Sequence, residues 1–394
     1  MEILTLNIRA LKCFLLWPKD NLNWLGNTAV SCLHLTVILM SSIQTLAAII
    51  YQLYIGIEDM NIICESFIGI SDCFGFIFIY FCFRKNHGLI KTAIKESSMF
   101  LKFCTPEVLT EAEEEVRTYT KGLLLYFSFG LTFNGLIPLY DYENCDKRRL
   151  SDYYRQHDPC GMPTRIWVPF DARKPAVYYS IFLLHANACL NICYGVLCIT
   201  MTLVGLLIHI SAQIKNLRQN LSEIFDEVPD AGCESTELAL KLEGKLKFCV
   251  KYHITIINYT NQVFAAFNLM LIVHVTLTSL IFGVLGYQIA TVEIFTEKLR
   301  YFMHLGGWIA LLFLTCYYGQ LILDESTTVA NAAYQSKWYN GPTYLRKNIC
   351  LIIMRSQKPL KLRAASIGVI SLETFVSVIK TAYSYFALLL SISE

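Results

Sequence analysis

The chain has 394 residues, of which 55% are hydrophobic and 16% charged, and its 33 basic residues nearly balance its 31 acidic ones. Soluble domains carry about 25% charged residues, and here the charges also cluster between long uncharged runs. This composition predicts an all-α membrane protein with several spans. A net charge of +2 gives no reason to expect a nucleic-acid partner.

Apolar segments predict seven membrane-spanning helices. They cover residues 28–50, 62–83, 122–140, 176 to about 214, 254 to about 292, 301–323 and 366–391. A span needs about 20 residues, so the fourth and fifth segments are nearly twice as long as required. We expect them to continue as helices into the cytosol. Residues 1–18 are apolar but charged and lack a cleavage site, which predicts a short interfacial helix.

The basic residues predict the orientation. Assigning the loops alternately to the two sides puts 23 lysines and arginines on the N-terminal side and 9 on the other. The N-terminus is therefore expected in the cytoplasm and the C-terminus outside. We divide the chain into residues 1–323 (the interfacial segment and helices one to six), a cytoplasmic region 324–366, and the terminal helix 367–394.

The cytoplasmic region 324–366 predicts two helices separated by Gly341-Pro342. The second places Leu345, Ile349, Ile352 and Ile353 on one apolar face, and Pro359 ends it. Such a face packs either within its own subunit or against another subunit. The second alternative uses a set of apolar and aromatic residues as a subunit interface: Tyr334, Trp338, Ile349, Ile352 and Ile353.

The terminal helix carries a stripe of small hydroxyl side chains. Ser377, Thr381, Ser384, Leu388 and Ser391 recur at spacings of four, three, four and three, which places them on one helical face. Small polar residues often pack helix against helix in lipid. Hydroxyls interrupted by one leucine also suit a water-filled pore wall with a hydrophobic constriction.

The cysteines and the other potentially catalytic residues form no pattern that is typical of an enzyme or a metal site. Most of the 15 cysteines lie in apolar runs and none has zinc-ligand spacing. Only Cys145 and Cys160 share a long polar loop and could pair. No nucleotide motif, metal motif or nucleophile with an adjacent base appears. We therefore expect neither an enzyme nor a cofactor or metal.

The carboxyl third contains four runs whose order is specific: Glu325-Ser-Thr-Thr-Val-Ala-Asn-Ala-Ala-Tyr-Gln-Ser-Lys-Trp-Tyr339, Ile353-Met-Arg-Ser-Gln-Lys-Pro-Leu360, Ser371-Leu-Glu-Thr-Phe375 and Ser384-Tyr-Phe386. These runs resemble the insect odorant receptors. The seven spans with an inside N-terminus extend the resemblance over the chain. The Met354–Pro359 run also resembles members from ants, bees and wasps.

The resemblance implies an odorant-binding subunit of a ligand-gated, non-selective cation channel. Such subunits form heterotetramers with a shared co-receptor in the plasma membrane of olfactory sensory neurons. A small volatile odorant would open a central pore to monovalent and divalent cations. Four terminal helices would line this pore, and the cytoplasmic helices would form an anchor domain where subunits meet.

Gustatory receptors, the sister family, end in Thr-Tyr, five apolar residues and Gln-Phe. Here the frame is Ser384-Tyr385, five apolar residues, then Ser391-Ile392. The resemblance implies a hydrophobic gate at Leu388 and favours an odorant receptor over a gustatory one. A gustatory-type homomeric channel, a metabotropic seven-helix receptor and a transporter stay as alternatives.

The resemblance also implies an odorant pocket in the outer half of segments two, three, four and six. The residues at the outer depth of these segments are mostly aromatic, with a few polar side chains. For each of these residues, packing in the core or against lipid is the alternative to ligand binding. The selected residues are Phe67, Ile70, Ser71, Phe74, Phe133, Asn134, Tyr178, Tyr179, Phe182, His185, Tyr301, His304 and Trp308.

Three charged residues fall inside predicted spans, where ionisable groups are costly and often functional. Asp72 lies in the second segment, and Glu373 and Lys380 lie on one face of the seventh. One hypothesis pairs Asp72 with Lys380. The alternative is a solvated carboxyl at Asp72.

Overall fold

The computed structural model describes residues 3–18, 24–54, 60–140, 156–228, 236–365 and 368–393. Helices form nearly all of it. In chain order they are α1 (Thr5–Cys13), α2 (Trp24–Tyr54), α3 (Met60–Lys85), α4 (His87–Glu96), η1 (Ser97–Lys102), α5 (Pro106–Tyr140), α8 (Pro175–Ser222), α9 (Thr236–Thr291), α10 (Phe295–Gln335), η2 (Trp338–Asn340), α11 (Thr343–Ser356) and α12 (Leu372–Ser393). Strands β1 (Arg363–Ala364) and β2 (Gly368–Val369) pair as a short antiparallel hairpin before α12.

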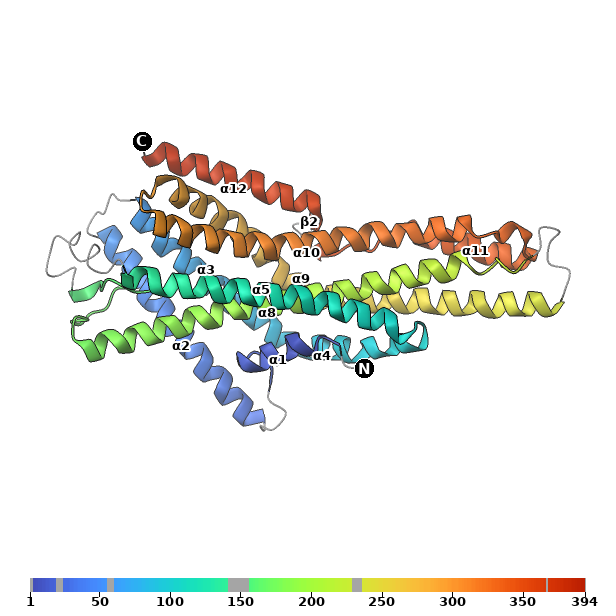
Figure 1. The fold of residues 1–394 in the computed structure, drawn as a ribbon, viewed down its shortest axis with the longest axis horizontal. Coiled ribbons are helices and arrows are strands. Elements are labelled where there is room, and N and C mark those ends of the chain that lie inside the picture. The colour runs from blue at the N-terminus through green and yellow to red at the C-terminus, as the bar shows by residue number, and fades with distance from the viewer. Residues whose placement is uncertain are drawn as a thin grey trace.

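Seven of the described helices are long and apolar enough to cross a membrane: α2, α3, α5, α8, α9, α10 and α12. This confirms the seven predicted spans. At 1.5 Å per residue, the 48 residues of α8, 56 of α9 and 41 of α10 extend about 72, 84 and 62 Å. These lengths exceed the roughly 30 Å of a bilayer core. Figure 1 shows α9 and α10 projecting beyond α12 to the end where α11 lies.

Several helix boundaries differ from the sequence expectation. α12 begins at Leu372 and not at residue 366, because Gly368–Val369 pairs as strand β2. α5 begins at Pro106 and not near residue 122, because a charged amphipathic stretch continues the apolar span as one helix. α10 runs unbroken to Gln335, so the first predicted cytoplasmic helix is the end of α10. Hydropathy marks only the part of a helix that suits lipid and therefore misses polar extensions.

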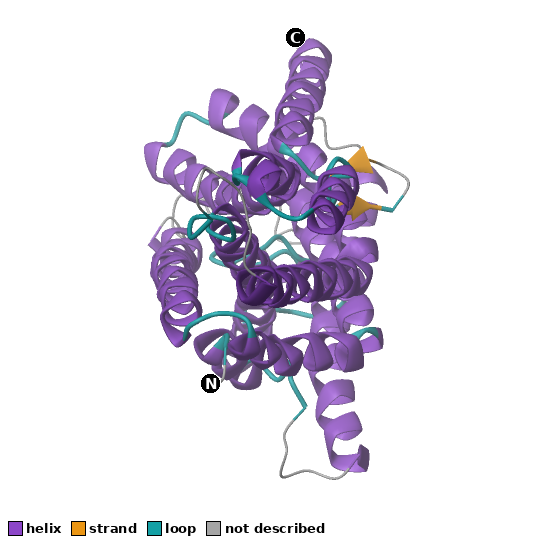
Figure 2. Ribbon diagram, turned by 90° about the vertical axis from the view of Figure 1, so that its right-hand side faces the viewer, coloured by secondary structure: helices purple, strands orange, loops and turns teal. Residues whose placement is uncertain are grey.

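The helix α8 forms the centre of the bundle, and α12 lies at its edge. In the most apolar window of α8, 94% of the residues are buried, compared with 11% in α12. α8 packs against α10 and α5, and α9 packs against α12 and α3. Figure 2 looks along the bundle and shows α12 at its periphery. One long face of α12 is therefore left for contacts outside the subunit.

A close approach between α9 and α12 depends on Gly283. A Cβ added there would lie 2.7 Å from the Cβ of Tyr385 and 2.9 Å from the carbonyl oxygen of Ala382. No side chain fits in that space without moving one helix. The absence of a side chain at this position therefore sets how closely the terminal helix can dock.

The N-terminal helix α1 is held against α5 by one carboxylate. Glu113 accepts hydrogen bonds from the backbone N–H groups of Leu4 (2.7 Å) and Thr5 (3.2 Å) and from the Thr5 hydroxyl (3.2 Å). An anion at a helix N-terminus satisfies backbone donors that have no helical partner. Leu4 and Leu11 are buried in the main core. The predicted interfacial segment thus packs onto the bundle as a helix.

The helix α11 buries its apolar face within the subunit. Leu345 and Ile349 are fully buried, Ile352 nearly so, and Ile353 packs against the same core. Ile349 and Ile352 therefore offer no surface to a second subunit in this arrangement. Tyr334, at the end of α10, is 68% exposed, and the Trp338 indole N–H donates to its carbonyl oxygen (3.2 Å).

Cys160 forms a disulfide bond, and its predicted partner, Cys145, lies outside the described residues. Cys73, Cys189 and Cys193, in the membrane part of the bundle, are not disulfide-bonded. Sulfur there acts as a small apolar group.

Candidate functional site

A cavity of about 130 Å³ lies among five helices and the loop before α8. For scale, an apolar cavity of roughly 150 Å³ holds benzene. The lining residues come from α2 (Ser41, Thr45), α3 (Glu65, Ile68, Gly69, Asp72, Cys73), α5 (Tyr126, Phe127, Gly130, Leu131, Asn134), the loop (Pro163, Thr164), α8 (Cys189, Ile192, Cys193, Val196) and α10 (Arg300, Tyr301, Met303, His304, Gly307, Trp308, Leu311). A site with this lining suits a small, mostly apolar molecule.

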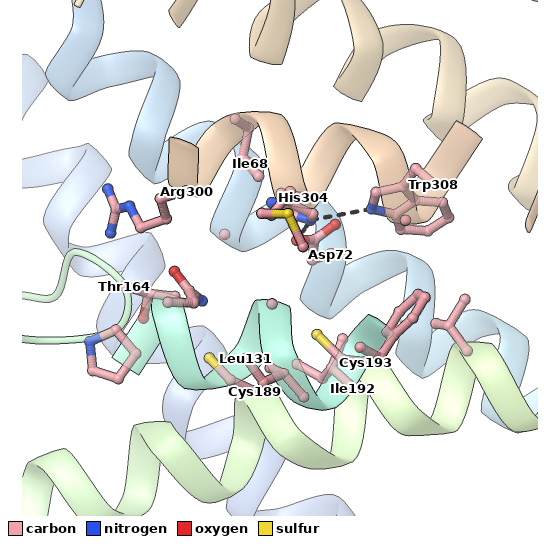
Figure 3. A pocket seen from close by; sticks show the side chains of 18 of the residues that line it. Ile68, Asp72, Leu131, Thr164, Cys189, Ile192, Cys193, Arg300, His304 and Trp308 are labelled. Carbon is pink, nitrogen blue, oxygen red and sulfur yellow. Dashed lines mark hydrogen bonds and ion pairs between the residues drawn. The ribbon is translucent and has the colours of Figure 1, made fainter. Parts of the chain in front are cut away.

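One wall of the cavity carries three polar side chains in a row. The Asp72 Oδ2 atom lies 3.3 Å from His304 Nε2, and the Trp308 indole Nε1 lies 3.2 Å from the same nitrogen. Figure 3 shows the three together, facing Leu131, Cys189 and Cys193 across the cavity. The Trp308 ring is also held edge-on against His274, with centroids 5.8 Å apart. Asp72 therefore pairs with His304 and not with Lys380, which is exposed on α12.

An ion-pair network closes one end of the cavity. Glu65 accepts from Arg300 Nη2 (2.7 Å) and from Arg165 Nε (2.9 Å), and Asp158 lies 3.5 Å from Arg165. Arg300 also contacts Glu297 at 2.8 Å. Burial lowers the pKa of the Arg165 guanidinium, but Glu65 and Asp158 outweigh burial and raise that pKa above its usual value. The network ties the loop, α3 and α10 together.

His185 braces the wall of the cavity from behind. Its Nδ1 lies 2.9 Å from the Ser41 hydroxyl and 3.1 Å from the Thr164 hydroxyl, and its Nε2 lies 2.6 Å from Gln44 Oε1. Two hydroxyl donors and one amide acceptor fit a neutral ring with its hydrogen on Nε2. The ring is fully buried, so it positions the cavity-lining Ser41 and Thr164 without lining the cavity itself.

Four of the residues selected from the sequence line the cavity: Asn134, Tyr301, His304 and Trp308. The others lie outside its lining. Three of them are exposed (Phe67, Phe74 and Tyr179), two are buried elsewhere (Ser71 and His185), and four are partly buried (Ile70, Phe133, Tyr178 and Phe182). The Tyr178 hydroxyl donates to the Cys160 carbonyl oxygen at 3.1 Å, which fixes the loop.

Sequence reasoning missed the cavity residues of α8 and, apart from Asn134, those of α5. In α8 these are Cys189, Ile192, Cys193 and Val196, which lie one to several turns beyond the aromatic residues selected near the start of the helix. Their spacing of three, four and seven marks one helical face, a signal that was present in the sequence. The spacing by itself does not predict that this face of α8 lines a cavity.

The stripe on α12 is exposed along its whole length. Ser377, Thr381, Ser384, Leu388 and Ser391 all lie on the surface, as does Ile392. The hydroxyls of Thr381, Ser384 and Ser391 donate to carbonyl oxygens of their own helix at 2.9, 3.3 and 2.8 Å. Such bonds use the hydroxyl hydrogens and leave oxygen lone pairs free to accept. The face suits contact with water or ions.

The cavity and α12 share one cluster of apolar side chains. Tyr301 lines the cavity and belongs to a buried cluster with Tyr287 and Leu285 of α9. Phe386, Leu389 and Leu390 of α12 pack against this cluster, and so does the cavity residue Trp308. The Tyr301 hydroxyl also accepts from Arg300 Nη2 at 3.0 Å. A displacement in the cavity wall therefore has a packed route to the terminal helix.

A family model described as 7tm Odorant receptor matches residues 59–383. The chain belongs to this family. Among similar proteins, Odorant receptor 67c of Drosophila melanogaster is 28% identical over 227 residues, which cover 57% of this receptor and 54% of the fly protein. The odorant receptor coreceptor of Ooceraea biroi is 26% identical over 155 residues, covering 38% of this receptor and 32% of that protein. The receptor thus matches about half the length of the fly protein and a third of the coreceptor.

The fold of the receptor matches a solved insect olfactory receptor. The structure of OR5 from Machilis hrabei in complex with eugenol superposes with a TM-score of 0.78 at 17% sequence identity, covering 98% of each chain. A second solved structure of the same protein gives the same TM-score. At this identity the likeness establishes the fold alone. The predicted seven-helix membrane fold is confirmed, and the resemblance to ants, bees and wasps stays a prediction.

Proposed function

We propose that this receptor is the odorant-binding subunit of a ligand-gated, non-selective cation channel. It would assemble with the odorant receptor co-receptor as a heterotetramer in the plasma membrane of olfactory sensory neurons. The observation that carries the proposal is the shared apolar cluster that connects the cavity at Tyr301 with Phe386 and Leu389 of α12. Family membership and the fold of α12 support it.

The cavity is the proposed odorant site. Its small size, its aromatic and sulfur-containing walls and its few polar groups, among them the row Asp72–His304–Trp308, suit a small volatile molecule. The structure of the similar receptor OR5 was determined with eugenol, a small aromatic compound. Asn134, Tyr301, His304 and Trp308 are the proposed ligand contacts that the sequence also selected.

The exposed stripe of α12 is the proposed pore wall. In a pore lined by four terminal helices, each α12 supplied by this receptor would present hydroxyl oxygens of Ser377, Thr381, Ser384 and Ser391 to permeating cations. Leu388, which is 56% exposed, would form the hydrophobic gate, with Ile392 beyond it. A ring of leucines closes a pore by excluding water, so a small outward movement of α12 would rehydrate it.

Gating follows from a difference in affinity. An odorant that binds the open state more tightly than the closed state by a few kcal/mol shifts the population toward the open state. In this receptor the wall of the cavity and the C-terminal part of α12 pack against the same apolar cluster, so one arrangement of the cluster favours one position of α12.

The excess of basic residues on the N-terminal side supports a cytoplasmic N-terminus, which would place α11 and the adjoining ends of α8, α9 and α10 in a cytoplasmic anchor.

The proposal is tested by patch clamp in cells that express the receptor with and without an odorant receptor co-receptor. We expect odorant-evoked cation current only with the co-receptor. Leu388→Ala should raise the current in the absence of odorant, because a shorter side chain weakens the dewetted constriction. Val376→Ala is the matched control, since Val376 is exposed on the same helix but lies outside the stripe.

Three outcomes would contradict the proposal in different ways. Current from the receptor alone would indicate a homomeric channel of the gustatory type. Current that requires a G protein would indicate a metabotropic receptor. Equal effects of Leu388→Ala and Val376→Ala on the current would show that Leu388 does not form the gate.

A further inference from the structure

The row Asp72–His304–Trp308 has an unusual hydrogen-bond arrangement. The indole N–H of Trp308 can only donate, and an ionised Asp72 carboxylate can only accept. Both lie within about 3.3 Å of one atom, His304 Nε2. That nitrogen carries either one hydrogen or one lone pair, so it can complete only one of the two bonds.

Each protonation state leaves one group of the row without its bond. With a hydrogen on Nε2, His304 donates to Asp72 and the Trp308 N–H faces another N–H. With a lone pair on Nε2, the ring accepts from Trp308 and the Asp72 carboxylate faces that lone pair. A protonated Asp72 would donate to the ring and again displace Trp308. The protein therefore cannot satisfy this row by itself.

A second acceptor at the same place is also unused. The Asp72 Oδ1 atom is buried and has no hydrogen-bond partner among the described residues. An unsatisfied polar group in an apolar setting is unfavourable, so a ligand that completes the bonds gains affinity. The side chains opposite, such as Leu131 and Cys193, contribute apolar surface and no strong hydrogen-bonding group.

We propose that Asp72, His304 and Trp308 form a polar subsite that selects ligands bearing a hydroxyl group on an apolar body of about one aromatic ring. This inference deepens the proposed odorant-binding function and rests on it. A hydroxyl both donates and accepts, so it can donate to Asp72 and accept from Trp308 while His304 bonds to either one. The cavity of about 130 Å³ limits the rest of the ligand to roughly the size of benzene.

Other functional groups fit the row less well. An aldehyde or ketone only accepts, so it can take the Trp308 N–H while His304 donates to Asp72 Oδ2, but it leaves Asp72 Oδ1 without a donor. An ammonium only donates, so it can satisfy Asp72 while His304 accepts from Trp308, but it has to leave water as a charged group for a largely apolar cavity, which is costly. A hydrocarbon satisfies neither. The subsite therefore ranks an alcohol above its matched aldehyde and amine, and places the hydrocarbon last.

The test measures ligand binding separately from gating. The receptor, purified with its co-receptor in lipid nanodiscs, is titrated with benzyl alcohol, benzaldehyde, benzylamine and toluene, and binding is followed by the rise in Tm. A second series uses 1-hexanol, hexanal, hexylamine and hexane. We expect the alcohol to bind at least about tenfold more tightly than the hydrocarbon in at least one series, because a hydrogen bond to a charged group is the strong kind.

Two variants assign the preference to the row. Asp72→Asn weakens the acceptor and Trp308→Phe removes the donor, so each should reduce the ratio of alcohol to hydrocarbon affinity about tenfold. The ratio is measured within one protein, so a general loss of stability does not change it. Phe74→Leu is the matched control, because Phe74 lies on α3 near Asp72 but is exposed and outside the cavity lining.

The outcomes separate this inference from the proposed function. A hydroxyl preference that both variants abolish supports the subsite even if no ligand evokes current, and in that case only the channel function fails. Equal binding of alcohol and hydrocarbon, a higher affinity for the amine or aldehyde, or no binding of either series overturns the subsite. A preference that survives both substitutions also overturns it.

Discussion

The docking of α12 onto α9 depends on the missing side chain at Gly283, and Gly283→Ala tests this directly. The new Cβ would approach the Cβ of Tyr385 to 2.7 Å and the Ala382 carbonyl oxygen to 2.9 Å. Real Cβ contacts are longer than 3 Å, and the obstructing atoms belong to the backbone or lie next to it. They cannot turn away, so α12 itself has to move.

The expected magnitude comes from two opposing effects. Overpacking a filled interior costs about 1–3 kcal/mol, and replacing glycine by alanine inside a helix returns up to about 1 kcal/mol. Gly286→Ala isolates the second effect, the gain from replacing glycine by alanine, because Gly286 lies one turn further along α9 and its Cβ would make an ordinary 3.6 Å contact with Phe386. The difference between the two variants is therefore the overpacking cost of about 1–3 kcal/mol.

The assay is thermal unfolding of the purified receptor, combined with patch clamp in cells that also express the co-receptor. We expect Gly283→Ala to lower Tm by about 2–5 °C relative to Gly286→Ala. Its displaced α12 should also change the current measured without odorant, whereas Gly286→Ala should not. Equal stability and equal currents for the two variants would refute the close-approach argument.

Three further predictions concern other parts of the receptor. Glu65→Gln should lower the free energy of unfolding by about 3 kcal/mol, because Arg165 and Arg300 lose their shared charged acceptor. Thermal unfolding measures this loss, and an unchanged Tm would show that the network is solvated. Ile349→Ala should cost about 2–5 kcal/mol since its side chain is fully buried, while Leu351→Ala, at a position 62% exposed on the same helix, should leave the unfolding of the subunit unchanged. Burial and two neighbouring cations lower the pKa of His87 to about 4 from its ordinary value of 6.5. The unfolded chain binds the proton more readily, so stability should be constant above pH 6.5 and fall between pH 6.5 and 4. This fall should be smaller in His87→Gln. Equal curves of Tm against pH for the native receptor and His87→Gln would contradict the pKa shift.

The sequence determined the membrane class, the number of spans and the exposed stripe of α12. Long uncharged runs can be stable only in lipid, and a helix in lipid satisfies its own backbone, so composition and length suffice to predict the seven spans. The stripe from Ser377 to Ser391 follows from helical spacing alone. The helical extension of α8 was also predictable, because polar residues such as His209 and Gln213 follow its apolar run without a helix breaker.

Only the tertiary structure decided which faces meet and at what depth. All seven spans are apolar around most of their circumference, so the sequence of α8 does not show which face turns inward, nor that this face braces the wall at His185 and lines the cavity further along at Cys193. The same limit applies to Asp72, whose partner His304 is more than 200 residues away in the chain. The sequence also did not determine that Ile349 is buried within its own subunit. An amphipathic pattern indicates that one face of a helix is covered, but it does not indicate what covers that face.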